Sequence, residues 1–130
     1  MATVLDVTAA FDKLTHFART PDSPADDRRK GLAQLAPYRD GGIFASKFSG
    51  SGGWERHTAG DEIVHVVDGA TLLHLLPDSG PRETLELRAG SMVIVPTGVW
   101  HRFESAAGVT LMSITPLPTE HPPVDVDDPR

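Results

Sequence analysis

The chain has 130 residues, of which 39% are hydrophobic and 23% are charged, which is typical of one folded soluble domain. The 18 acidic residues against 12 Lys and Arg give a net charge of −6, which argues against a nucleic-acid partner. The lack of cysteine excludes disulfides and thiolate chemistry. Because no signal peptide or membrane-length apolar run is recognisable, we expect a cytoplasmic protein with no membrane partner.

Two segments are expected to flank a central domain. In the first, residues 1–38, apolar residues at helical spacing predict a short helix over 8–20, and Pro21 ends it. Residues 21–30 are rich in proline and charge and predict an exposed loop, with the basic run 28–30 in solvent. The last segment, residues 116–130, is rich in Pro and Asp and predicts an extended arm, either loose or lying on a neighbouring subunit.

The central part, residues 39–115, alternates between polar and apolar residues and is divided by Gly- and Pro-rich turns. Short strands at this regular spacing predict an all-β sandwich or barrel. The pair Asp68-Gly69 between two apolar runs predicts a hairpin. The expected strands are 43–48, 53–58, 62–67, 70–76, 83–87, 91–95, 100–104 and 109–114.

Two histidines and two carboxylates stand out on these strands. Glu55 and His57 are two residues apart, so their side chains point to the same face of one strand. Glu62 opens the next strand, and His101 begins another one. If the faces of these strands look into one barrel, the four side chains can bind a divalent ion. Nitrogen and oxygen donors of this kind suit Fe, Mn, Ni or Zn without choosing between them.

Two motifs with fixed spacing resemble those of the cupins. The first is Glu55-x-His57-x4-Glu62-x6-Gly69, with Glu where the family has its first histidine, and the second is Gly90-x5-Pro96-x-Gly98-x2-His101. The resemblance implies a double-stranded β-helix, which is a jelly-roll barrel, behind a short N-terminal helix. It also implies a small-molecule pocket with a divalent metal ion, and a homodimer. The family contains dioxygenases, isomerases, epimerases, decarboxylases and ligand-sensing domains.

The glutamate at position 55 leaves two interpretations open. Glu55 is either a fourth metal ligand, or it marks a barrel that has lost its metal. Without a cation, two carboxylates in an apolar barrel would repel each other, and one would have to stay protonated at neutral pH. This argument favours a metal site made of Glu55, His57, Glu62 and His101.

Other side chains near these ligands are candidates for the pocket wall or for the core. Alternation points Trp54, Trp100 and His65 away from the metal ligands, and it places Arg56 and Arg102 on the opposite face in surface salt bridges. His16 and His121 are expected on the surface outside the barrel. The possible lining residues are Phe103, His74, Phe44, Phe48, Val64 and Met112, with Val66, Met92 and Ile94 as further candidates.

Three functions are compatible with this site. The first is a metal-dependent enzyme on a small organic molecule, with Lewis-acid or dioxygenase-like chemistry. The second is a module that binds or senses a small molecule without turnover. The third is a metal-free isomerase or epimerase, with an acid–base pair such as Glu62 and a histidine. The sequence identifies neither the substrate nor the metal.

Overall fold

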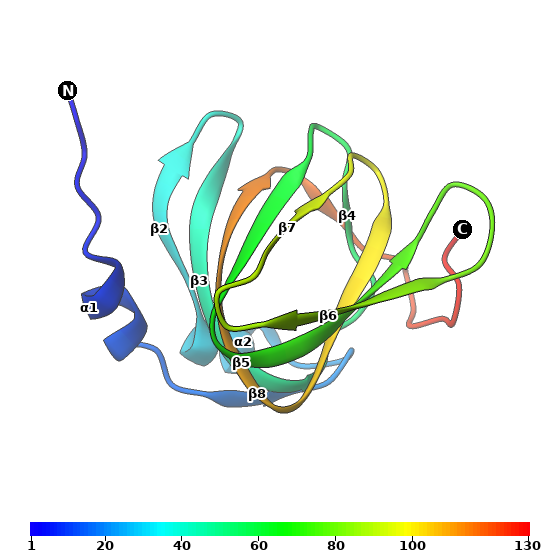
Figure 1. Cartoon of the computed structure of the whole chain (residues 1–130), viewed down its shortest axis with the longest axis horizontal. Coiled ribbons are helices and arrows are strands. Elements are labelled where there is room, and N and C mark those ends of the chain that lie inside the picture. Colours follow the sequence, from blue (N-terminus) through cyan, green and yellow to red (C-terminus); the bar gives the residue numbers. More distant parts are fainter.

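The computed structural model describes residues 1–130 and shows a curled, mainly β structure (Figure 1). A seven-stranded sheet has the order β1-β3-β8-β5-β6, with β2 beside β3 and β7 beside β5, and β4 pairs with β9 in a separate ribbon. The all-β jelly-roll prediction is confirmed. The elements are α1 (Val7–Asp12), β1 (Phe17–Arg19), α2 (Ala25–Gly31), β2 (Leu32–Tyr38), β3 (Gly41–Ser51), β4 (Arg56–His57), β5 (Glu62–Leu76), β6 (Glu83–Arg88), β7 (Met92–Val95), β8 (Trp100–Pro116) and β9 (Thr119–Glu120).

Long strands replace several of the short strands that the sequence predicts. The hairpin prediction at Asp68-Gly69 is wrong, because β5 continues through these residues and stays paired with β8. The register of that pairing shifts on both sides of Gly69, whose φ of +75° is the conformation that a bulge demands. A bulge and a tight hairpin both need glycine in the left-handed region, so the dipeptide alone does not distinguish them.

The N-terminal segment also differs from the prediction. The helix ends at Asp12 instead of residue 20, and Phe17–Arg19 form β1, which runs parallel to β3. The ring of Phe17 packs against Phe48 with 6.4 Å between centroids, so tertiary packing overrides the helical periodicity. Residues 25–31 form α2 instead of a loop, and residues 32–38 form a strand that the sequence did not reveal.

The barrel interior is closed by apolar side chains from the large sheet. They are Phe48, Val64, Val66, Leu73, Leu75, Leu87, Val95, Phe103, Val109 and Leu111. A second cluster contains Trp54, Trp100 and Leu76, so the two tryptophans pack away from the residues predicted as metal ligands. Arg56 forms the expected ion pair at the surface, with Glu120. Arg102 differs, because its side chain is only 18% exposed and lies over the ring of Trp54, 4.0 Å from Asp125.

The C-terminal segment lies on its own barrel, so the prediction of a loose arm or one laid on a neighbour is wrong. Thr119 and Glu120 pair with β4. The guanidinium of Arg130 donates to the carbonyl oxygens of Pro77 and Gly80, which places the C-terminus beside the loop between β5 and β6 (Figure 1).

No helix in the structure combines the length and the hydropathy that crossing a membrane requires.

Candidate metal centre and its cavity

Three strands and one bridge bring the four predicted ligands together. His57 ends β4, Glu62 opens β5, and His101 is the second residue of β8. Glu55 is held beside His101 by two backbone hydrogen bonds of 2.9 Å, because each residue donates its N–H to the other's carbonyl oxygen. One ligand atom from each of the four side chains lies within 4.8 Å of all the others. The gathering of these residues therefore follows from strand pairing.

The carboxylate of Glu62 lies between the two imidazoles. Its Oε2 is 3.3 Å from His57 Nε2, and its Oε1 is 3.2 Å from His101 Nε2. Glu55 Oε1 is 3.5 Å from the same His101 nitrogen. The side chains of His57, Glu62 and His101 are buried, and that of Glu55 is 17% exposed. Glu55 is thus the most accessible member of the set.

Hydrogen bonds from outside the cluster orient these side chains. His101 Nδ1 lies 2.9 Å from the carbonyl oxygen of Val99, to which it donates, and this leaves Nε2 free to face the cluster. His57 Nδ1 lies 3.2 Å from the hydroxyl of Thr119 in β9. Thr115 donates its hydroxyl to Glu62 Oε2 at 2.6 Å. Partners of this kind fix which atom of a ligand can meet a metal ion.

The two carboxylates and His101 strongly change one another's protonation. Burial lowers the pKa of His101, but Glu55 and Glu62 together raise it to about 10. Burial raises the pKa of Glu62, but His101 and His57 lower it to about 2. The pKa of Glu55 is also lowered in spite of its burial, chiefly by His101. Without a metal ion, the cluster therefore holds two anions and a protonated His101 at neutral pH. The expectation that one carboxylate would stay protonated is wrong, because the protonated His101 supplies the positive charge between them.

The atoms that face the centre of the cluster fit a divalent ion. His57 Nε2, Glu62 Oε1 and His101 Nε2 are buried and have no hydrogen-bond partner, although they lie near one another. Leaving a buried polar atom unpaired costs about 1–3 kcal/mol. Imidazole nitrogen and carboxylate oxygen are the donors that Zn²⁺, Fe²⁺, Mn²⁺ and Ni²⁺ accept in proteins. One cation would satisfy all three unpaired atoms.

A cavity of about 240 Å³ opens from this cluster, and Glu55, His57 and Glu62 form part of its wall. Phe44, Phe48, Val64 and Phe103 line it as expected from their strand faces. His74 and Met112 do not. His74 Nδ1 instead lies 2.9 Å from the Thr84 hydroxyl.

Three further lining candidates also lie elsewhere. Met92 and Ile94 are each 62% exposed on the outer face of β7, and Val66 is packed in the core. Alternation in β7 turns Val93 and Val95 inward, so the assignment was one residue out of phase.

A family model described as "Cupin domain" matches residues 46–115, which is more than half of the chain and includes all four residues of the cluster. The chain belongs to the cupin family. An acireductone dioxygenase from Rhodopseudomonas palustris is 36% identical to this cupin over 112 residues, which are 85% of this chain and 62% of that protein. The chain thus spans less than two thirds of that relative's length.

Solved structures share the fold of this cupin at low sequence identity. A cupin-2 domain protein from Shewanella frigidimarina superposes with a TM-score of 0.61 at 20% identity, over 91% of this chain and 94% of the other. A hydroquinone 1,2-dioxygenase from a Sphingomonas species, with 4-hydroxybenzoate bound, superposes with a TM-score of 0.55 at 22% identity. That match covers 65% of this chain and 64% of the other. Both matches support the same barrel architecture.

Several cavity residues of this cupin were missed by sequence reasoning. Arg19, Arg28 and His121 line the cavity but lie outside the matched residues 46–115. Arg28 was expected in solvent and His121 on the surface; His121 is exposed, yet its Nδ1 lies 3.1 Å from the carbonyl oxygen of Trp54. Because these residues come from the flanking segments, only the docking of those segments could reveal their place.

Proposed function

We propose that this chain is a metal-dependent enzyme of the dioxygenase-like kind that acts on a small organic molecule. In this proposal Glu55, His57, Glu62 and His101 hold a divalent ion. The observation that carries the proposal is the convergence of four donor atoms within 4.8 Å, three of which are buried and unpaired. The acireductone dioxygenase relative supports the choice of oxygenase chemistry within the family.

The protein's own residues would have three tasks. The two imidazoles and two carboxylates would hold the ion, and the two negative charges would balance its charge. Four protein donors leave about two positions open in an octahedral site, which is enough for a bidentate organic ligand. A divalent ion bound there would polarise substrate oxygen atoms and, if it is iron, would activate O₂. Phe44, Phe48 and Phe103 would keep bulk water away from the reacting molecule.

The alternatives have weaker support in the geometry. A metal-free isomerase would use His101 and a neighbouring carboxylate as acid and base, but it would leave His57 Nε2 buried without a hydrogen-bond partner. A binding module without turnover would use the same cavity and the same ion. Oxygen consumption separates this module from the enzyme.

The first experiment is elemental analysis of protein purified without a metal-affinity tag. About one equivalent of Fe, Mn, Ni or Zn per chain is expected, and Glu62→Gln is expected to lose most of it. The metal-loaded protein is then tested for O₂ consumption with an acireductone, catechols and keto acids. Absence of metal in the wild type, with no gain on reconstitution, would overturn the proposal. Bound metal without O₂ consumption would favour the binding module.

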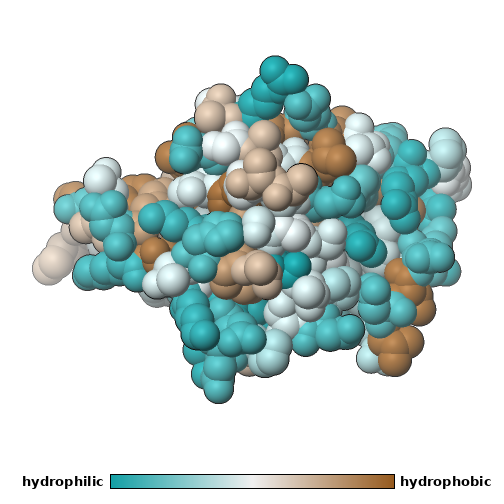
Figure 2. Space-filling view, turned by 90° about the horizontal axis from the view of Figure 1, so that it is seen from below, coloured by the Kyte–Doolittle hydropathy of each residue, from teal (hydrophilic) through white to brown (hydrophobic).

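We also propose that the protein is a homodimer through the outer face of the sheet. Strand register places Ile43, Ile114, Ile63 and Ile94 in one row across β3, β8, β5 and β7. The neighbouring row contains Met112, His65 and Met92. By contrast, the face of the molecule seen in Figure 2 is mostly hydrophilic, and its hydrophobic residues lie in small separate groups that form no such row. A continuous apolar row is what a subunit interface needs.

A further inference from the structure

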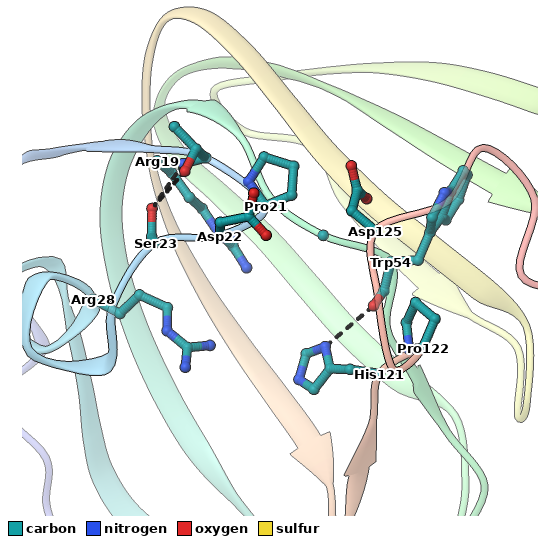
Figure 3. A pocket seen from close by; sticks show the side chains of 11 residues that line it. Arg19, Pro21, Asp22, Ser23, Arg28, Trp54, His121, Pro122 and Asp125 are labelled. Carbon is teal, nitrogen blue, oxygen red and sulfur yellow. Dashed lines mark hydrogen bonds between the residues drawn. The ribbon is translucent and has the colours of Figure 1, made fainter.

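The cavity beside the Glu/His cluster adjoins a second cavity. The second cavity also measures about 240 Å³ and is lined mainly by polar residues. Arg19, Arg28 and His121 line both cavities, so they stand where the two meet. Figure 3 shows Arg28 and His121 reaching toward each other from opposite sides of the opening. These three side chains are therefore placed to contact a molecule bound in either cavity.

Arg19 and Arg28, the arginine pair, have no acidic partner. No ion pair within 4.0 Å involves either residue, whereas Arg29 and Lys30, beside Arg28 in α2, pair with Asp26 and Asp27. Arg28 Nε is buried without a hydrogen-bond acceptor. Both arginines are half-buried, and a buried N–H group normally has an acceptor, so the buried Nε of Arg28 indicates that an acceptor is missing here.

The space around Arg19 is shaped for its guanidinium. The group lies over the ring of Phe48, 5.1 Å from its centroid. A Cβ on Gly52 would come within 2.5 Å of Arg19 Cζ, so any larger residue there would displace it. Burial lowers the pKa of Arg19, Glu55 raises it, and the charge of Arg28 lowers it. The guanidinium is therefore held between the aromatic wall, the cluster and a second positive charge.

The charges around the cavity define what it accepts. A divalent ion with two carboxylates is close to neutral, so the arginine pair adds positive charge that nothing in the cavity balances. The acidic residues of the second cavity, Asp22 and Asp125, form no ion pair with either arginine, and Asp125 approaches Arg102 instead. Arginine presents a fork of donors that matches a carboxylate. The volume of about 240 Å³ lies below the usual range of pockets for drug-sized ligands, so the ligand is small.

We propose that the arginine pair binds the carboxylate of a small organic acid while the other end of that acid reaches the Glu/His cluster. This inference names the substrate class of the proposed enzyme and so rests on the proposed function. The arginine pair gives the cavity its preference for an anion and orients the molecule. The cluster receives the oxygen atoms at the opposite end.

The test compares two catechols of similar size, one with a carboxylate and one with a neutral carboxamide. Protein loaded with redox-inactive Zn²⁺ is titrated calorimetrically, without oxygen, with 3,4-dihydroxybenzoate and with 3,4-dihydroxybenzamide. The benzoate is expected to bind about tenfold tighter or more, as a charge-assisted hydrogen bond predicts. Added salt is expected to weaken the benzoate alone. Equal affinities in the wild type, or no binding of either compound at millimolar concentration, would overturn the inference.

Variants assign the preference to particular side chains. Arg28→Gln and Arg19→Gln are each expected to bring the benzoate close to the affinity of the amide. Arg29→Gln, which changes the exposed neighbour, is the matched control and is expected to change neither affinity. Circular dichroism checks that each variant folds, and Arg28→Lys, which retains a charge, is expected to keep part of the preference. A preference that survives both glutamine variants contradicts the proposal.

The two proposals fail in different ways. If the wild type holds no metal, the same titration is made on the metal-free protein. If the metal-free protein prefers the benzoate and Arg28→Gln removes this preference, the proposed carboxylate site is supported and the proposed metal-dependent enzyme is rejected. If metal is stoichiometric but the two catechols bind equally, the metal enzyme stands and the carboxylate site is rejected.

Discussion

At the scale of single residues, the orientation of the candidate metal ligands depends on hydroxyl groups that belong to no recognisable sequence motif. Alternation places Glu55 and His57 on one face of a strand, and the resemblance of two motifs to those of the cupins implied that Glu62 and His101 join them. Thr115 and Thr119 could not be predicted, because threonine is common on any strand and its role here depends on the register with β5 and β4. The position of Arg28 in the cavity wall could not be predicted for a related reason. The way α2 packs on the barrel decides which of three adjacent basic residues points inward.

Thr115→Val is expected to weaken metal binding about 10- to 100-fold, because it removes the hydrogen bond that orients Glu62. Competition with a chromogenic chelator measures the affinity. Thr110→Val is the matched control, because Thr110 lies on the same strand and makes no such contact with the cluster. Equal affinities of the two variants would show that the hydroxyl has no role in holding the ion.

Metal binding is expected to release about one proton from His101. Its raised pKa, about 10, keeps Nε2 protonated at pH 7, and an ion at Nε2 must displace that proton. The apparent metal affinity is therefore expected to rise with pH, by up to about tenfold per unit, between pH 6 and 8. Calorimetry in buffers of different ionisation enthalpy counts the released protons. A value near zero would contradict the protonated state.

The same raised pKa affects the stability of the metal-free protein. Protonation of His101 stabilises the fold fully below pH 6.5, and this contribution disappears as pH rises through about 10. Thermal unfolding of the metal-free protein is therefore expected at a lower temperature at pH 9 than at pH 7. The metal-loaded protein, in which the ion replaces the proton, is not expected to show this particular loss.

At the scale of elements, β5 and β8 determine the shape of the barrel. Each strand bends and continues, so that the first half of β5 pairs with β7 and the second half with β6. Polar–apolar alternation predicted these stretches as strands. The bends were read as turns, because local sequence does not show whether the chain reverses or only shifts register. Long-range pairing also created β1 and β2, for which the local periodicity gave no signal.

Gly69→Ala is expected to destabilise the fold by at least about 1–2 kcal/mol, the usual cost of left-handed backbone for an L-residue. An additional cost follows because the new Cβ would collide with the carbonyl oxygen of Gly108. Gly80→Ala is the control, because its φ is +96° but nothing lies near its missing Cβ. Urea unfolding measures the free energy of unfolding of both variants and of the wild type. A smaller loss for Gly69→Ala than for Gly80→Ala would contradict a tight bulge.

At the scale of the whole molecule, the outer sheet face and the C-terminal segment define what surrounds the barrel. The composition of the last residues predicted an extended backbone but not its place, because proline and aspartate contain no information about a docking partner. The structure seats this segment on β4 and on the loop between β5 and β6. Leu117, Thr119 and His121 consequently close one side of the cavity.

Ile94→Asp is expected to convert the proposed homodimer to a monomer, because it places a charge at the most exposed end of the apolar row. Sedimentation velocity at micromolar concentration measures the change in mass. Leu85→Asp is the control, because Leu85 has comparable chemistry, is 39% exposed and lies on β6 outside the row. A wild type that sediments as a monomer would refute the interface, as would an Ile94→Asp protein that remains dimeric.

The arginine pair and the metal ligands come from different stretches of the chain. All candidate ligands lie between residues 55 and 101, whereas both arginines precede residue 31. If the arginine pair binds the substrate as proposed, exchanges at positions 19 and 28 would change which molecules bind without replacing any candidate ligand, provided that β1 and β2 stay paired with β3. Chimeras that keep this pairing and join the β1 and α2 segments of another cupin to residues 41–130 offer a route to new specificities.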